Sequence, residues 1–307
     1  MAILEEIIRS LPKEAHLQID TIVAELRTLR VASQEHRQRR DRPVKLPSRK
    51  ALVGIVDGLS AALFPNRLGS PELTDDGIDY YVGHTLDVTL RELLVQVRCE
   101  LHFASGLEIV SDADHEQAIA IIRAFAKRLP DIRNMLDGDI CAAYEGDPAA
   151  RSIDEVLVCY PGIIAIKHYR LAHELYDLGI PLIARMISEI AHSATGIDIH
   201  PGAQIGSSFF IDHGTGVVIG ETAILGKNVR LYQAVTLGAK RFPVDEHGAL
   251  VKGNARHPIV EDDVVIYAGA TILGRITIGR GSTIGGSVWL THSVPPGSSI
   301  SQAQMRT

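Results

Sequence analysis

Residues 260–290 read VEDDVVIYAGATILGRITIGRGSTIGGSVWL, with an aliphatic residue at every sixth position. An earlier set with the same spacing begins after Gly196. The two sets are Ile199, Ile205, Ile211, Val217, Ala223, Val229 and Val235, and then Val260, Ile266, Ile272, Ile278, Ile284 and Leu290. A second phase starts inside the first set, with Ile219, Leu225, Leu231 and Leu237. This change of phase predicts an irregular turn near residues 217–219.

A six-residue period is typical of a parallel β-helix. Three six-residue sides form one triangular coil, and each repeat points one aliphatic side chain inward. Stacked coils then bury a continuous core that no single repeat could bury alone. Glycine and other small residues, as in Ile278–Gly279, permit the tight corners. We therefore expect a β-helix over residues 197–307.

A long polar stretch, AKRFPVDEHGALVKGNARHP, interrupts the register between Gly238 and Ile259. We interpret it as one extended loop over about residues 239–258. Long loops within regular repeats are more often functional than idle.

The first part of the chain, residues 1–196, is expected to be an α-helical domain because its apolar residues recur at spacings of three and four. One such stripe is Ile19, Ile22, Val23, Leu26 and Leu29, and another is Leu86, Leu90, Leu93, Leu94 and Val97. A third helix is expected to begin near Ser111–Asp112 and to stop at Pro130. Residues 161–190 are expected to be helical with a break around Gly179–Pro181.

Composition indicates a globular protein of 307 residues with 46% hydrophobic residues and a net charge of −6. The three cysteines form no CxxC pair, which fits a reducing compartment. The N-terminal residues lack a basic segment followed by an apolar core, and no run reaches the roughly 18 residues of a membrane span. The basic run at residues 35–43 contains no aromatic residue and is interpreted as a solvated helix end or linker. We expect a cytoplasmic protein without a nucleic-acid or membrane partner.

Four sequence motifs, taken in their order and spacing along the chain, restrict the possible protein families more than the repeat alone does. They are DIHPGAQIG at 198–206, FFIDHGTGVVIGETA at 209–223, VRLYQAVTLG at 229–238 and ARHPIV at 255–260. Upstream, DPAARS starts at 147 and KHYRLAHEL starts at 167. Together these residues resemble the serine O-acetyltransferases, hexapeptide-repeat acyltransferases, over about residues 145–295. The helical region before that is similar to the longer N-terminal variants of the family. The resemblance implies a left-handed parallel β-helix behind an α-helical domain, assembled as a trimer or a dimer of trimers.

The activity implied is transfer of acetyl from acetyl-CoA to L-serine, giving O-acetyl-L-serine and CoA in cysteine biosynthesis. The serine hydroxyl is a weak acid, so a base must take its proton as it attacks the thioester, and an imidazole suits this task. The resemblance implies that His213 is this base and that Asp198 orients it. The alternatives are a solvated surface histidine at 213 and a simple turn aspartate at 198.

The resemblance also implies the residues that bind the substrates. Asp147 and Asp212 match the acids near the serine ammonium, and Arg256 and His257 match the Arg-His pair near its carboxylate. Asp147 could instead be an ordinary helix-start residue, and Arg256 a solvated loop arginine. The positions that match acetyl-CoA contacts are Leu237, Gly238, Ala239, Ala268, Gly269, Gly285 and Gly286. Two of them, Ala239 and Gly286, depart from the family pattern while staying small. No metal is expected.

Three other functions stay open at this point. The acceptor could be homoserine or a sugar, which a comparison of acceptors would decide. A γ-carbonic-anhydrase-like enzyme would hold zinc through three histidines, but His213 lies within DHGTG rather than in such a set. A non-catalytic β-helix scaffold would need no base at 213.

Two regulatory partners follow from the resemblance. L-Cysteine differs from serine by one side-chain atom and is expected to act as a feedback inhibitor. A complex with O-acetylserine sulfhydrylase is expected to be weak or absent, because the sequence ends Gln-Met-Arg-Thr and lacks the terminal isoleucine that the family uses.

Overall fold

The structure is a computed structural model that describes residues 19–36, 45–105, 112–241, 245–246, 248 and 250–302. Predictions about residues 1–10, the basic run after His36, Ser111 and the last five residues lie outside this part of the chain. The chain divides into two units, residues 1–45 and 46–307. Helix α2 (Ile19–His36) belongs to the first unit. Its predicted apolar stripe is half exposed, from 49% at Leu26 to 64% at Leu29.

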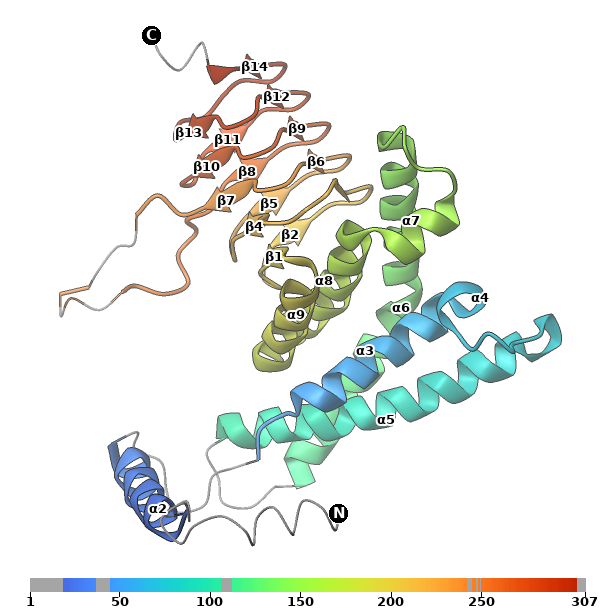
Figure 1. The fold of residues 1–307 in the computed structure, drawn as a ribbon, viewed down its shortest axis with the longest axis vertical. Helices are drawn as coiled ribbons and strands as arrows, with labels where there is room; N and C mark the ends of the chain where they lie inside the picture. The colour runs from blue at the N-terminus through green and yellow to red at the C-terminus, as the bar shows by residue number, and fades with distance from the viewer. Residues whose placement is uncertain are drawn as a thin grey trace, which may run out of the picture. The chain divides into compact units, whose positions relative to one another are not determined.

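The second unit begins with helices, as the spacing of its apolar residues predicts (Figure 1). They are α3 (Arg49–Leu63), α4 (Pro65–Leu68), η2 (Asp75–Gly77), α5 (Ile78–Ser105), α6 (Asp112–Gly146), α7 (Ile153–Cys159), α8 (Pro161–Asp177) and α9 (Pro181–Thr195). Gly179 has a φ of +81° and Pro181 lies at the start of α9, which confirms the predicted break between the last two helices. None of the helices described is both long enough and apolar enough to cross a membrane.

The prediction that a helix stops at Pro130 is wrong. Helix α6 continues through Pro130 for 35 residues in all. A proline inside a helix lacks one backbone hydrogen bond, at a cost of about 3 kcal/mol. Apolar side chains on both sides of it are buried and offset this cost, among them Phe125 and Leu129 before it and Ile132 and Leu136 after it.

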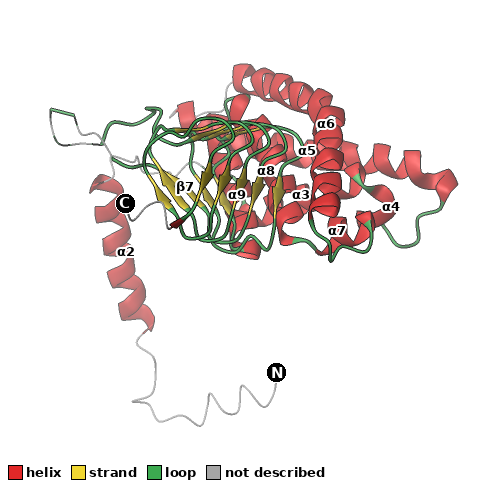
Figure 2. Cartoon of the chain, turned by 90° about the horizontal axis from the view of Figure 1, so that it is seen from above, coloured by secondary structure: helices red, strands yellow, loops and turns green. Residues whose placement is uncertain are grey.

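After α9 the chain forms three parallel sheets whose short strands lie over one another in successive coils (Figure 2). Sheet A contains β1 (Asp198–Ile199), β4 (Val218–Ile219), β7 (Thr236–Gly238), β10 (Thr271–Leu273) and β13 (Trp289–Leu290). Sheet B contains β2 (Gln204–Ile205), β5 (Ile224–Leu225), β8 (Ile259–Val260) and β11 (Thr277–Ile278). Sheet C contains β3 (Phe210–Ile211), β6 (Arg230–Leu231), β9 (Val265–Ile266), β12 (Thr283–Ile284) and β14 (Ser299–Ile300). The order A, B, C repeats along the chain from β1 to β13, as a parallel β-helix requires, and an isolated bridge between Ile278 and Val294 takes the place of a sheet B strand before β14.

The irregular turn predicted near residues 217–219 is the corner between β3 and β4. Eight residues separate Phe210 from Val218, against six between Arg230 and Thr236 at the same corner of the next coil. The insertion explains the two phases in the sequence. Each repeat buries two side chains rather than the one expected: Ile219 is buried, and so is Val217 two residues before it. The six-residue spacing that runs from Ile199 to Val235 therefore changes position within the coil. It starts at the buried residue inside each strand, as at Ile199 in β1, and ends at the buried residue just before each strand, as at Val235 before β7.

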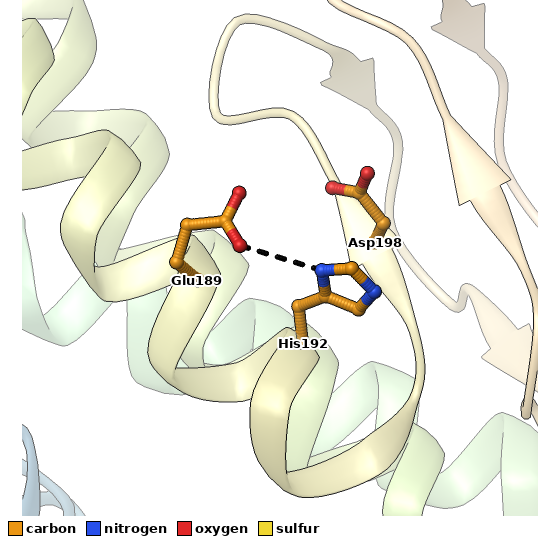
Figure 3. Close-up of side chains that lie close together, drawn as sticks. All are labelled: Glu189, His192 and Asp198. Atoms are coloured by element: carbon orange, nitrogen blue, oxygen red, sulfur yellow. Dashed lines mark hydrogen bonds and ion pairs between the residues drawn. The ribbon is translucent and has the colours of Figure 1, made fainter.

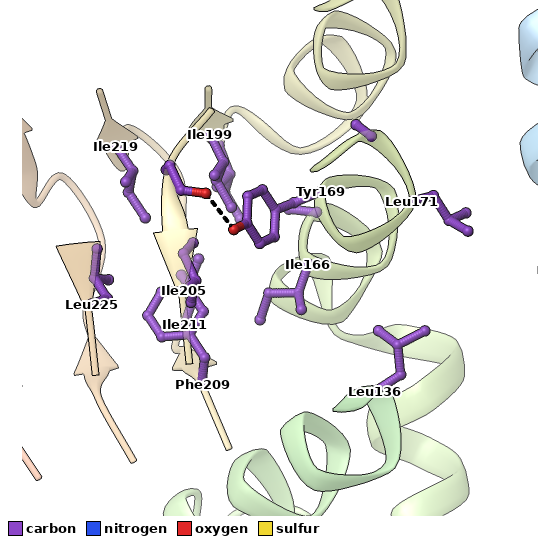
Figure 4. Packing of buried hydrophobic residues seen from close by; sticks show 14 of the residues in the cluster. Leu136, Ile166, Tyr169, Leu171, Ile199, Ile205, Phe209, Ile211, Ile219 and Leu225 are labelled. Carbon is purple, nitrogen blue, oxygen red and sulfur yellow. Dashed lines mark hydrogen bonds between the residues drawn. The ribbon is translucent and has the colours of Figure 1, made fainter. Parts of the chain in front are cut away.

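The helices dock onto the first coil through a buried polar contact. Arg170 of α8 donates to the carboxylate of Asp139 of α6, and both side chains are at most 3% exposed. Arg170 also donates to the carbonyls of Ile205 and Gly206, while Asp139 accepts from the Phe209 N–H at 2.8 Å. Figure 4 shows the apolar packing beside this contact, where the ring of Tyr169 lies against the first coils. The Tyr169 hydroxyl donates a hydrogen bond to the Ala203 carbonyl at 2.6 Å.

Candidate active site

The candidate residues lie along two edges of the β-helix. We call the edge between sheets C and A the histidine edge; it comprises residues 212–217, 232–235, 267–270 and 285–288. We call the edge between sheets A and B the arginine edge; its described residues include 200–203, 220–223, 239–241, 250–258 and 274–276. Sheet A lies between the two.

The first coil has two extra residues at the corner between β3 and β4, and we call residues 212–217 the histidine bulge. His213 lies on this bulge rather than at a position of the regular repeat. His213 has a φ of +58°, and its side chain is 69% exposed. Gly214 and Gly216 also have positive φ, near +80°, a conformation that glycine adopts without strain. The Gly214 N–H donates to the Asp212 carbonyl at 2.6 Å, which closes the bulge. Asp212 Oδ1 lies 3.6 Å from His213 Nδ1, so the nearest carboxylate is that of the preceding residue.

Asp147 joins this cluster from the end of α6. Its carboxylate accepts from the Tyr160 hydroxyl at 2.5 Å and from the Ala149 N–H at 2.8 Å. These two hydrogen bonds, and the nearby His213, lower the pKa of Asp147 below its usual value. The same contact raises the pKa of Tyr160 to about 12. The site therefore presents a carboxylate that stays ionised beside an imidazole.

A second cluster lies on the arginine edge. Arg256 Nη2 is 2.7 Å from Glu221 Oε2, and both side chains are about a quarter exposed. The Arg256 N–H donates to Thr222 Oγ1 at 2.9 Å, so the end of the long loop is anchored to the coil below it. The carboxylate of Glu221, which pairs with Arg256, also accepts a hydrogen bond from the Tyr176 hydroxyl at 3.3 Å. Glu221 thus fixes the guanidinium at the rim of the coil.

His257 is buried in this cluster and is held neutral. Burial, followed by the positive charge of Arg256, lowers its pKa to about 4. Its Nδ1 accepts from the Thr222 N–H at 3.0 Å, which assigns the ring proton to Nε2. The ring packs flat on Gly220, where an added Cβ would lie 2.1 Å from Nε2. His257 can therefore donate one hydrogen bond from Nε2 to an anion.

Within one subunit the two clusters remain apart. In the part of the chain that the structure describes, no hydrogen bond or ion pair links Asp147, Asp212 or His213 to Arg256 or His257. The strand order gives the reason, since sheet A separates the histidine edge from the arginine edge.

Asp198 lies in β1, at the start of sheet A, and pairs in register with Val218. Its nearest ionic partner is Arg185, at 3.9 Å, and it lies beside Glu189 and His192 of α9 (Figure 3). No hydrogen bond or ion pair to His213 is seen among the described residues of one subunit. The orienting role of Asp198 stays a prediction.

The positions that match acetyl-CoA contacts also divide between the two edges. Leu237 and Gly238 end β7 of sheet A, and Ala239 follows them at the start of the arginine edge. Ala268, Gly269, Gly285 and Gly286 lie on the histidine edge. A Cβ at Gly286 would approach the Ala268 carbonyl to 3.2 Å, so a small residue suits this position.

Sequence reasoning missed several residues of the site. Tyr160 and Glu221 act through partners 13 and 35 residues away, so no local spacing marks them. Tyr232 and Tyr267 stack on the histidine edge with ring centroids 5.0 Å apart and an interplanar angle of 13°. They occupy the column above Asp212, because the register aligns the strand residues that precede them.

Comparison with known proteins agrees with this architecture. The profile of the family "Bacterial transferase hexapeptide (six repeats)" matches residues 257–292. A curated relative, the plasmid-encoded serine acetyltransferase of Synechococcus elongatus, is 58% identical over 94% of this chain and 92% of its own length. The crystal structure of serine acetyltransferase isoform 3 from Entamoeba histolytica, in complex with cysteine, has a TM-score of 0.68 at 36% identity, covering 85% of this chain and 83% of that one. Soybean serine acetyltransferase complexed with serine has a TM-score of 0.51 at 30% identity, covering 80% and 93%.

The repeat and the histidine bulge define a hexapeptide-repeat acyltransferase. Within that class, the chain belongs to the serine acetyltransferase family, as its similarity to the Synechococcus relative over nearly its full length shows. The fold expected from the resemblance, a left-handed parallel β-helix behind a helical domain, is confirmed.

Proposed function

We propose that the chain transfers the acetyl group of acetyl-CoA to the hydroxyl of L-serine, giving O-acetyl-L-serine and CoA, as a step in cysteine biosynthesis in the cytoplasm. The observation that carries this proposal is the cluster of Asp147, Asp212 and His213 on the two-residue bulge. It offers a base and two carboxylates to a substrate that has a hydroxyl and an ammonium group.

In the proposed mechanism His213 takes the proton of the serine hydroxyl as that oxygen attacks the thioester carbonyl. The exposed imidazole can accept a proton, and the adjacent Asp212 carboxylate stabilises the imidazolium that forms. The tetrahedral adduct then collapses, the C–S bond breaks, and the imidazolium returns the proton to the CoA thiolate.

The substrate's charged groups suit the two clusters. Asp147 and Asp212 would bind the ammonium group, and Tyr160 keeps Asp147 ionised for this role. Arg256 and the Nε2–H of His257 would bind the carboxylate, a pairing of a guanidinium and an N–H with an anion. L-Cysteine has the same two groups, and we propose that it competes with serine at this site.

The separation of the clusters supports an assembly of at least three copies. A head-to-tail ring brings the histidine edge of one subunit against the arginine edge of the next, because the two edges are different surfaces. Apolar side chains are exposed around sheet A and the histidine edge: Val218 at 37%, Tyr267 at 43% and Trp289 at 61%. In this arrangement acetyl-CoA lies in the groove between neighbouring β-helices, where the glycines of both edges meet.

A comparison of acceptors tests the proposed function. With acetyl-CoA supplied, we expect CoA release with L-serine at a kcat/KM at least about 10²-fold above that with L-homoserine or a sugar, because an extra methylene or a missing charge misplaces the hydroxyl. Thiol release is followed by a colorimetric reagent. Turnover of a sugar without turnover of serine would overturn the proposal.

A further inference from the structure

Three potential metal ligands meet where α9 gives way to β1. The ligand atoms of Glu189, His192 and Asp198 all lie within 4.8 Å of one another, and each side chain is partly accessible (Figure 3). His192 Nδ1 lies 3.4 Å from Glu189 Oε2. None of the roles proposed above uses Glu189 or His192.

The donor set suits zinc. Zinc binds imidazole nitrogen and carboxylate oxygen at about 2.0–2.2 Å, and sites with three protein ligands leave a fourth position for water. A tetrahedral site with such bonds needs ligand atoms about 3.3 Å apart. His192 Nδ1 and Glu189 Oε2 already have this spacing. The Asp198 carboxylate oxygen must move toward these two atoms by roughly 1.5 Å at most.

The backbone holds the three ligands on ordered elements. Glu189 and His192 are three residues apart on α9, so they share one helix face. Gly196 ends this helix in the left-handed conformation, with a φ of +71°, and turns the chain back. The Asp198 N–H donates to the Val217 carbonyl at 2.9 Å, which fixes Asp198 opposite the helix. Metal binding therefore needs side-chain rotation rather than refolding.

A guanidinium competes for the same carboxylates. Arg185 Nη2 lies 2.6 Å from Glu189 Oε1 and 3.9 Å from Asp198 Oδ1, and its side chain is 40% exposed. Arg185 therefore offsets part of the negative charge of the two carboxylates when no metal is bound. An incoming divalent cation must displace it into solvent, which weakens the metal site without abolishing it.

We infer that Glu189, His192 and Asp198 form a zinc site that regulates the enzyme by occupying Asp198. The inhibition, unlike the binding, rests on the proposed function together with the separate prediction, from the family resemblance, that Asp198 orients His213. Zn²⁺ bound to the Asp198 carboxylate offsets its negative charge, so the carboxylate stabilises a protonated imidazole less well. Zinc is here an inhibitor and takes no part in acetyl transfer.

Calorimetric titration of the purified full-length protein with Zn²⁺ at pH 7.5, without substrates, tests the binding. We expect one zinc site per chain. Its affinity for zinc should fall at least about tenfold in His192→Gln, since even the loss of a residue that only supports a ligand lowers metal affinity about 10- to 100-fold. In Arg185→Gln we expect binding about three- to fivefold tighter, because a screened competing cation has been removed. These opposite shifts separate metal ligation from a general loss of structure.

His292→Gln is the matched control, since His292 is an exposed histidine at the far end of the β-helix, and it should bind zinc as the wild type does. Without metal, His192→Gln should acetylate serine at the wild-type rate, and zinc should inhibit it less than the wild type. Equal zinc affinity in the wild type and His192→Gln, or weaker binding in Arg185→Gln, would overturn the inference. Because binding is measured without substrates, this result does not depend on which acceptor the enzyme uses.

Discussion

Replacement of His213 by alanine is expected to lower kcat for serine acetylation by about 10²–10⁴-fold, the usual contribution of a general base. The reason is that the serine hydroxyl loses the only imidazole on the histidine bulge, and a neighbouring carboxylate is too weak a base to replace it. The KM for acetyl-CoA should stay within about twofold, since the bulge is not among the positions matched to the cofactor.

The control for this variant is His292→Ala, which removes an exposed histidine remote from the bulge and should leave kcat unchanged. Steady-state kinetics at saturating acetyl-CoA provide the measurement. A His213→Ala enzyme that retained more than about a tenth of wild-type kcat would show that another group accepts the proton.

Replacement of Asp139 by alanine is expected to destabilise the fold by about 3–5 kcal/mol, the cost of leaving one partner of a buried ion pair uncompensated. Arg170 would remain in a site where it is only 3% exposed, and the Phe209 N–H would lose its acceptor. Because Asp139 lies on α6, which ends one residue before Asp147, loosening this contact should also weaken serine binding.

Urea denaturation followed by circular dichroism measures this effect. The control is Asp87→Ala on α5, which breaks an ion pair with Arg91 whose side chains are 59% and 75% exposed, and it should change stability by at most about 1 kcal/mol. Equal unfolding free energies for the two variants would mean that the Asp139–Arg170 contact does not hold the helices on the first coil.

The β-helix could be predicted because each six-residue side repeats the same local pattern, and the regular recurrence of that pattern stacks the coils on one another. Even the bulge at residues 212–217 was visible as a shift of phase at Val217–Ile219. Helix α6 was harder, since local rules end a helix before Pro130, whereas burial of Phe125 and Leu136 on either side keeps it continuous.

The candidate site was predicted as a set of residues but not as an arrangement. Asp198 and His213 are fifteen residues apart, fewer than the eighteen residues of an ideal coil. Asp198 pairs with Val218, one full coil further along the chain, so His213 lies within the same coil as Asp198 and not level with it. Tyr160 and Glu221 escaped notice because their roles depend on tertiary contacts with Asp147 and Arg256.

The central claim is that a base on one subunit and a carboxylate-binding arginine on the next complete each site. It is tested most directly by mixing two inactive chains. His213→Ala and Arg256→Ala are each expected to retain about 1% or less of wild-type kcat/KM for serine when purified alone.

Co-expressed in equal amounts with two different affinity tags and purified through both, the two variants should form mixed oligomers. Every mixed trimer then has one site in three that combines an intact His213 with an intact Arg256 from the neighbour, so about a third of wild-type kcat/KM should return, or about a quarter for a dimer of trimers. Mixed oligomers that stayed at the parental 1% level would contradict the account, since they would show that both residues must come from the same chain.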